Sequence, residues 1–429
     1  MQKYDAVSRV NIGRWLIWGS FALVLLVAPL VFTGGLARTV LSQMGIAIIA
    51  CLSYNILLGQ GGMLSFGHAV YTGLGSFLAI HALNSVSAGS LPIPVSAVPI
   101  VGGLAGAGFA VLLGYVTTRK SSTTFAMITL GMAELVFAMS LMIPEFFGGE
   151  GGVSGNRVAG SPTLGITFGP QVQVYYLVAA YTFVCVIAMF AFTRTPLGRI
   201  LNAVRDNPER VEFIGYNPHR VRYIAFIIAG FFAGISGGLG ALSFEIVTAE
   251  VVGAARSGAY LLFTFLGGAT FFFGPIIGGV LMVLAFVLLS EFTKAWLLYL
   301  GLIFMFMVMY APGGIASLIM MNVRVAAFGK LRRLWRSYAM LTLAVVVAFA
   351  GMSTLIEMIY HLQLNQTSGS TLSFLGVQLD VQKWSSWGGA VGVVAAGMAA
   401  LEFFRRKFLL KWGTIQEEIE HEIKRREAL

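Results

Sequence analysis

The sequence predicts an all-α polytopic integral membrane protein, and three observations carry that prediction. Of the 429 residues, 57% are hydrophobic and 11% are charged, against about half and about a quarter in an ordinary soluble domain. The mean hydropathy is +0.84. The apolar residues form long runs, and about 20 such residues cross a hydrocarbon core of about 30 Å as a helix. A water-soluble globule and a disordered chain are therefore excluded.

Twelve apolar runs satisfy this length requirement when short or broken helices are counted. The runs at 255–270 and 295–310 are short and lie beside Gly and Pro residues. Such irregular backbone is tolerated at membrane depth where neighbouring protein satisfies its polar groups. We therefore expect about 12 transmembrane helices, at 15–32, 39–58, 63–83, 95–117, 123–143, 174–192, 223–242, 255–270, 276–293, 295–310, 338–359 and 386–403.

The distribution of basic residues orients these spans. If the N-terminus is cytoplasmic and the spans alternate, all but five of the 28 Lys and Arg residues lie on the cytoplasmic side, as membrane proteins prefer. A span missed in mid-chain would destroy this asymmetry, so both termini are expected in the cytoplasm. The five exceptions are Arg38, Arg157, Arg256, Lys294 and Lys383.

Residue types and spacing exclude several functions. The net charge of +10 comes from short basic clusters between apolar runs, without the aromatic-interleaved basic surface of a nucleic-acid-binding protein. Cys51 and Cys185 lie in apolar runs and the five histidines are scattered, which predicts no metal site. A G-x-x-x-x-G-K-[ST] phosphate-binding loop is absent. We expect this chain to hold no cofactor and not to hydrolyse ATP.

The segment 195–222, between the sixth and seventh expected spans, is the most informative loop. Its apolar residues alternate with charges at roughly helical spacing, Asn207-Pro208 offers a helix start, and Gly215 offers a stop. One interpretation is an amphipathic helix lying on the anionic inner leaflet. Two glutamates in the loop would be repelled by that leaflet, so we favour a docking element for a soluble partner.

Four motifs in this order and spacing resemble the branched-chain amino acid ABC transporter permease family, of the hydrophobic amino acid uptake type. Within the loop, Gly198-Arg199 and the AVRDN run at 203–207 resemble the family's EAA-type loop. This chain differs from the family pattern at Thr270, where the family usually has a glycine, and at Pro208. The difference at Pro208 predicts a slightly later start of the docking helix. The other three motifs are LGQ with LSFGHA at 58–69, LGG with GP and Gly279 at 266–279, and YAPGGI at 310–315.

The resemblance implies a division of the chain and a set of partners. Residues 1–321 would form the permease core of about ten spans, including the 195–222 coupling loop. A two-span extension at 322–404 and an amphipathic tail at 405–429 lie outside the family. The family imports amino acids, branched-chain or related small amphipathic molecules, through the bacterial inner membrane. A second permease subunit, identical or different, a periplasmic substrate-binding protein and two cytoplasmic ATPases that bind ATP and Mg would complete the importer.

The resemblance also assigns the coupling loop to a groove of the ATPase. Charged side chains would provide complementarity, while Ile200 and Ile214 would be buried in that groove. The residues expected to couple ATP hydrolysis to transport are Gly198, Arg199, Ile200, Ala203, Arg205, Asn207, Arg210, Glu212, Ile214 and Gly215.

A second group of residues is a candidate for the translocation path. Glu134 is the only acidic residue well inside an expected span, where a carboxylate costs at least about 2.5 kcal/mol unless it meets protein or water. It either contacts the path or forms an interhelix hydrogen bond. Gln60, Ser65 and His68 either line the route at a helix end or hold a close helix crossing. The expected helix-break residues are Gly267, Gly268, Gly274 and Pro275.

Two other classes remain as alternatives to the importer. An ion-coupled secondary transporter or channel, acting without an ATPase, would carry several ionisable groups at membrane depth, whereas the expected spans contain essentially one. A membrane-embedded enzyme would need a cluster of catalytic or metal-binding side chains, which the scattered His and Cys residues do not supply.

Overall fold

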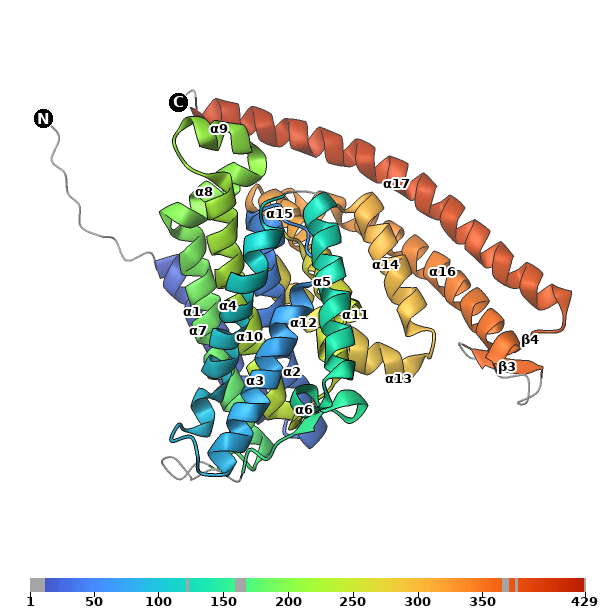
Figure 1. Ribbon diagram of the computed structural model, residues 1–429. Coiled ribbons are helices and arrows are strands. Elements are labelled where there is room, and N and C mark those ends of the chain that lie inside the picture. The colour runs from blue at the N-terminus through green and yellow to red at the C-terminus, as the bar shows by residue number, and fades with distance from the viewer. Residues whose placement is uncertain (1–11, 121–122, 159–166, 365–369, 375–376, 428–429) are drawn as a thin grey trace, which may run out of the picture. The chain divides into compact units, whose positions relative to one another are not determined.

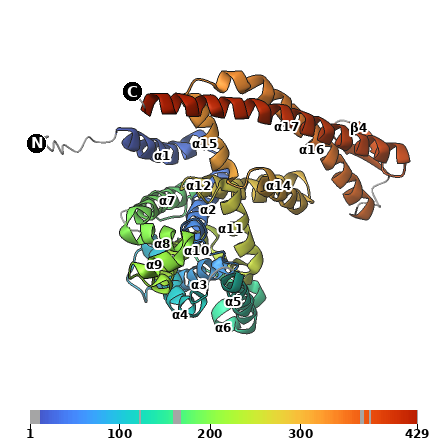
Figure 2. The same cartoon turned by 90° about the horizontal axis from the view of Figure 1, so that it is seen from above.

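The fold is almost wholly helical, which confirms the predicted all-α class (Figures 1 and 2). It was obtained as a computed structural model that describes residues 12–120, 123–158, 167–364, 370–374 and 377–427. The chain divides into two compact units, Met1–Leu289 with Phe304–Ser317 and Ser290–Ile303 with Leu318–Leu429.

The first unit contains most of the helices of the expected permease core, whereas residues 290–303 and 318–321 of that core fall in the second unit. The first unit's one small sheet pairs β1 (Val153–Ser154) antiparallel with β2 (Ile246–Val247). Its helices are α1 (Ile12–Val31), α2 (Gly35–Asn55), which continues as the π-helix η1 (Ile56–Gln60), α3 (His68–Ser87), η2 (Val95–Ala97), α4 (Val98–Thr117), α5 (Thr123–Met142), α6 (Pro144–Phe147), η3 (Gly149–Gly151), α7 (Gln171–Arg194), α8 (Pro196–Asp206), α9 (Pro208–Phe213), α10 (Pro218–Phe244), η4 (Ala249–Val252), α11 (Ala254–Gly267), α12 (Gly274–Leu284) and η5 (Ala285–Leu289).

Helix α10 runs through the middle of this unit, between α2, α3 and α4 (Figure 2). Glycines allow α4 and α10 to touch backbone to backbone. A Cβ atom at Gly234 would clash with the carbonyl oxygen of Gly102, and one at Gly106 would clash with the carbonyl oxygen of Gly230. Small residues of this kind let helices approach closely in lipid, where dispersion rather than the hydrophobic effect holds them together.

The second unit is dominated by a helical hairpin. Helices α16 and α17 run antiparallel, with Gly351 against Val394 and Gly397 against Ala348. The elements that contribute to this unit are α13 (Ser290–Phe292), α14 (Trp296–Tyr310), α15 (Gly314–Ala327), α16 (Leu331–Leu364), β3 (Thr371–Phe374), β4 (Val377–Asp380) and α17 (Trp384–Glu427), of which α14 and α15 are shared with the first unit.

Eight helices in the described part of the chain are long and apolar enough to cross a membrane, or nine if α14 and α15, bent by 46° at a short break, form one span. The remaining expected spans correspond to three weaker elements. The apolar part of α1, Trp15–Val31, is short, and α11 has 14 residues. Helix α3 has 20 residues but is almost entirely buried in protein, so its sequence need not match lipid.

The C-terminal elements are longer than expected. The span at 386–403 and the tail at 405–429 were expected as separate elements, but α17 is one helix of 44 residues. The charges at the junction do not interrupt it, because Arg405 and Arg406 donate hydrogen bonds of 2.9 and 2.8 Å to Glu402 on the preceding turn. Helix α15, directly after Pro312, was not expected.

Candidate functional site

The loop between α7 and α10 folds into the two short helices α8 and α9, at one end of the first unit (Figure 1). Both begin with a polar cap followed by proline. Thr195 Oγ1 accepts a hydrogen bond from the Gly198 backbone N–H at 3.2 Å, and Asn207 Oδ1 accepts one from the Arg210 N–H at 3.0 Å. These caps satisfy backbone donors that a helix start leaves free.

The boundaries of α9 test the sequence interpretation directly. The helix begins at Pro208, so the start predicted at Asn207-Pro208 is confirmed and the later start expected from the family pattern is wrong. The predicted stop at Gly215 is also confirmed, with a φ of 87°. Leu201, Val204 and Val211 are buried against the core and hold the loop on the unit.

A patch of three apolar side chains lies on the outside of the loop. Phe213 is 89% exposed, Ile214 is 67% exposed and Tyr216 is 48% exposed. Ile200 differs from Ile214, because it is half-buried and packs on the protein's own core. The free apolar surface is therefore Phe213, Ile214 and Tyr216, which we call the docking patch. Phe213, its most exposed member, was missed as a candidate contact residue.

The predicted charged residues of the loop fall into two groups. Arg199, Arg210 and Glu212 are exposed and make no ion pair with any residue in the described ranges, and Ala203 beside them is also exposed. Arg205 instead reaches inward. It pairs with Asp206 at 2.9 Å and donates a hydrogen bond to the carbonyl oxygen of Gly59.

The contact between Arg205 and Gly59 joins two motifs that lie 146 positions apart in the sequence. The receiving segment is the end of η1 and the turn after it, where Gly62 has a φ of 62°. A side chain there would be strained by the backbone and would meet the Cγ atom of Arg205 at 2.6 Å. Gln60, half-buried, lies between these two glycines. The glycines of this motif therefore make room for the loop arginine.

The other two glycine motifs meet at the same place, which we call the glycine junction. A Cβ atom at Gly59 would clash with the carbonyl oxygen of Ala269, and one at Gly268 would lie 2.6 Å from the carbonyl oxygen of Gly313. Gly268 has a φ of 112°. The expected helix breaks are found here, since α11 ends at Gly267 and α12 begins at Gly274, with Pro275 in its first turn.

The turn that follows the glycine junction is tied to two neighbouring helices. The Phe66 backbone N–H donates to Thr129 Oγ1 of α5 at 3.1 Å, and the Ala69 N–H donates to Ser257 Oγ of α11 at 2.9 Å. A Cβ atom at Gly67 would clash with the carbonyl oxygen of Thr129. Displacement of this turn would therefore act on α5 and α11.

Ser65 and His68 are fully buried within this arrangement. Tyr54 donates a hydrogen bond from its hydroxyl to the Ser65 carbonyl oxygen at 2.8 Å. The Nε2 atom of His68 lies 2.8 Å from Ser53 Oγ, and its ring meets that of Tyr260 edge-on. In this conformation both residues hold the turn in place.

Glu134 differs from these residues because it is exposed on the outer face of α5. The two hydroxyls considered as partners are engaged elsewhere: Ser140 donates to the Phe137 carbonyl oxygen at 2.6 Å, and Thr129 donates to that of Ala126 at 2.9 Å. Glu134 makes no hydrogen bond or ion pair with any described residue. Among the described residues, therefore, neither hydroxyl clamps Glu134.

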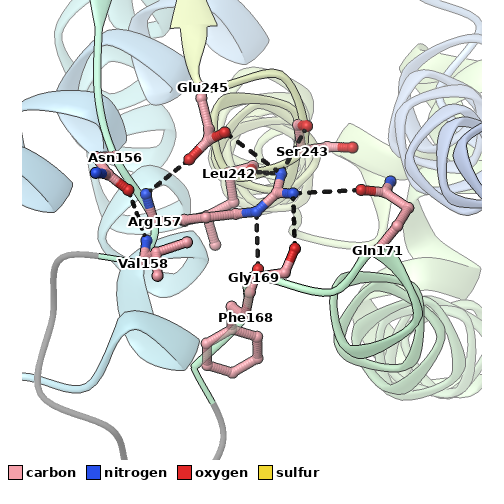
Figure 3. Close-up of polar contacts among 9 residues, drawn as sticks. All are labelled: Asn156, Arg157, Val158, Phe168, Gly169, Gln171, Leu242, Ser243 and Glu245. Carbon is pink, nitrogen blue, oxygen red and sulfur yellow. Dashed lines mark hydrogen bonds and ion pairs between the residues drawn. The ribbon is translucent and has the colours of Figure 1, made fainter.

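A polar centre at the other end of the first unit was not predicted. Arg157, 12% exposed, points into the end of α10 and donates to the carbonyl oxygens of Leu242 and Ser243 at 3.2 and 3.1 Å (Figure 3). It also donates to the carbonyl oxygen of Phe168 at 2.8 Å, and its backbone N–H donates to Glu245 at 2.9 Å. A cation at a helix C-terminus is favourable. Arg157 therefore ties its own segment and Phe168 to the end of α10.

The sequence contains one signal for this centre. Arg157 is one of the five basic residues that fall outside the cytoplasmic side in the expected topology. A basic residue retained on the disfavoured side needs a local structural reason, and the last turn of α10 provides it. Its partners could not be identified from the sequence, because they lie 11 to 88 positions away.

Comparison with known proteins identifies a family and three similar sequences. Residues 36–312 match the family described as "Branched-chain amino acid transport system / permease component". The chain is 28% identical over 292 residues to the high-affinity branched-chain amino acid transport system permease protein LivM of Escherichia coli (strain K12), which covers 63% of this chain and 67% of the relative. It is also 28% identical, over 294 residues, to LivM of Salmonella typhimurium, with the same coverage.

A shorter match gives 32% identity over 78 residues to the guanosine ABC transporter permease protein NupQ of Bacillus subtilis (strain 168), 18% of this chain and 24% of that protein. No solved structure matches the chain significantly. Within the described ranges, no group of three His, Cys, Asp or Glu side chains could hold a metal ion.

Proposed function

We propose a mechanism for this chain from one premise: it belongs to the branched-chain amino acid transport system permease family, and is a membrane-spanning permease subunit of an ABC importer rather than an enzyme. We propose a branched-chain amino acid or a related small amphipathic molecule as its substrate. The two relatives that match over 63% of this chain are both branched-chain amino acid permeases, which supports this proposal.

The proposed site of coupling is the docking patch at the end of α9. Apolar side chains this exposed, in a loop that also exposes Arg199, Arg210 and Glu212, suit a groove on a soluble ATPase. Binding energy at such an interface concentrates in central apolar side chains, while exposed charges tune specificity and association rate. ATP and Mg would be bound by the two ATPases.

The observation that carries the proposed mechanism is the hydrogen bond from Arg205 to Gly59. It links the coupling loop to the glycine junction, where the chain's backbone segments touch without intervening side chains. Closure of the ATPase dimer would move α8, and Arg205 would carry that movement to the turn at 62–69. Transporters switch between inward- and outward-open packings by movements of this kind.

The movement would then reach the translocation path through α5. Thr129 accepts the hydrogen bond from Phe66, and Glu134 lies just over one helical turn further along α5. We propose that Glu134 faces the path at the contact with a second permease subunit. Gln60, Ser65 and His68 would bound the same path from the turn, with Ser65 and His68 enclosed in the conformation described.

The proposed assembly lies in the bacterial inner membrane. Two permease subunits, identical or different, two cytoplasmic ATPases and a periplasmic substrate-binding protein would form it, with both termini of this chain in the cytoplasm. That orientation places the docking patch with the ATPases, and the loop organised by Arg157 on the side of the binding protein.

Reconstitution tests the proposal. The chain, its second permease, the ATPases and the binding protein are assembled in proteoliposomes, and uptake of radiolabelled leucine is measured with and without ATP. Uptake that requires ATP and the ATPases supports the proposal. Uptake by this chain alone, driven by an ion gradient, would favour a secondary transporter or channel and would refute it.

A further inference from the structure

Basic side chains are concentrated at one end of the α16–α17 hairpin. This end consists of the start of α16 and the second half of α17. Leu334 of α16 and Val325 of α15 meet Ile415 and Ile419 of α17 in a small apolar cluster. The rings of Tyr338 and Phe408 also meet, tilted by 57° with their centroids 5.0 Å apart. These contacts fix the register of the hairpin, so the basic residues around them keep defined positions.

A shallow cavity of about 1010 Å³ lies on this end of the hairpin. Arg332, Arg336 and Lys411 line it, and none of the three pairs with an acidic side chain in the part of the chain that is described. Arg333 also lines the cavity but differs from these three, because it forms an ion pair with Glu418 at 3.2 Å. We call Arg332, Arg336 and Lys411, with Trp335 between them, the basic groove.

The depth of the basic groove places it beside the membrane surface. The apolar part of α16 ends near Met340, and Arg336 is one turn beyond it, about 6 Å along the axis at 1.5 Å per residue. The headgroup layer extends about 5–8 Å beyond the hydrocarbon core. Trp335 is 73% exposed, and tryptophan side chains favour this interfacial layer.

We propose that the basic groove binds the phosphate of an anionic phospholipid headgroup. Arg336 lies at headgroup depth beside an exposed indole, Arg332 and Lys411 line the same cavity, and a phosphodiester supplies the negative charge that the three unpaired cations lack. An acidic segment of a protein could neutralise the same cations, but it would have to displace lipid from this layer. The proposal does not rest on the importer mechanism, since it needs only that the hairpin spans a membrane.

The test measures lipid binding to the intact chain purified in a neutral detergent. Cardiolipin is titrated by native mass spectrometry, with phosphatidylcholine as the zwitterionic comparison and inorganic phosphate as the soluble one. The variant carries R332Q, R336Q and K411Q together. The matched control carries K407Q, K424Q and R425Q, which removes the same charge from the same hairpin outside the groove.

The wild-type chain and the control variant should bind cardiolipin in preference to phosphatidylcholine. The groove variant should bind cardiolipin about 100-fold more weakly, as expected for three cations near a membrane surface. If the triple variant does not fold, as judged by gel filtration, the single change R336Q should still weaken binding about fivefold.

Three results would overturn the proposal. Equal loss of cardiolipin binding in the groove and control variants would mean that only net charge matters. Displacement of cardiolipin by millimolar inorganic phosphate would make the groove a site for soluble anions. Unchanged lipid binding together with lost association of the ATPase subunits would assign the groove to a protein partner.

Discussion

Replacing Arg205 with alanine should separate ATP hydrolysis from transport. The guanidinium donates to the Gly59 carbonyl oxygen across 146 positions of sequence, and it is the side-chain link that we propose between the coupling loop and the glycine junction. A hydrogen bond from a charged group contributes about 1.5–3 kcal/mol. Because the Arg205 side chain is 38% exposed, we expect the lower end, about 1.5 kcal/mol, which is about tenfold in an equilibrium between two conformations.

The assay is the ratio of leucine imported to ATP hydrolysed in proteoliposomes that contain the complete importer. Arg205→Ala should lower this ratio by up to about tenfold, while the ATPase subunits remain bound and active. Arg220→Ala is the matched control, because Arg220 is an exposed arginine at the start of α10 whose backbone, not its side chain, takes part in the cap by Asn217. A ratio unchanged by Arg205→Ala, or lowered equally by Arg220→Ala, would refute the proposed route.

Three further predictions follow from burial and close contact. Phe213→Ala with Ile214→Ala should reduce co-purification of the ATPases by at least tenfold and leave the melting temperature of the free permease unchanged, since both side chains are exposed. Gly234→Ala should lower the melting temperature of the chain, because its Cβ would clash with the α4 backbone, whereas Gly108→Ala, with open space around it, should not. Glu134→Gln should leave the melting temperature of the isolated chain unchanged but lower uptake in the assembled importer; a destabilised chain with normal uptake would make Glu134 structural.

Much of the helical framework could be predicted because it depends on local sequence. Apolar runs marked the long helices, and the Asn207-Pro208 pair with Gly215 marked both ends of α9. Helix α17 was predicted as two elements because its charged middle resembles a span boundary. Only the i,i+3 and i,i+4 pairing of Glu402 with Arg405 and Arg406 explains why the helix continues.

The arrangement of the site could not be predicted because it depends on contacts between distant residues. Four motifs were recognised separately, and nothing in their spacing indicates that Arg205, Gly59, Ala269 and Gly313 meet. The solvent exposure of the apolar side chains in the coupling loop could not be predicted either. The sequence gives Ile200 and Ile214 the same apolar character, yet Ile200 packs on the protein and Ile214 does not.

The composition of the glycine junction has a mechanical consequence. Where side chains lie between two helices, a small displacement can be absorbed by rotamer changes, which cost about 1 kcal/mol. At Gly59 and Gly268 the chain touches backbone carbonyl groups directly, and no rotamer is available to absorb movement. A shift of η1 must therefore move Ala269 or break the contact. Arg205 is then the flexible link between the coupling loop and this junction, so changes at Arg205 should weaken coupling gradually. Gly59→Ala should instead displace α11 and α12 and abolish folding or uptake outright, and partial uptake with an intact coupling ratio in that variant would contradict a rigid junction.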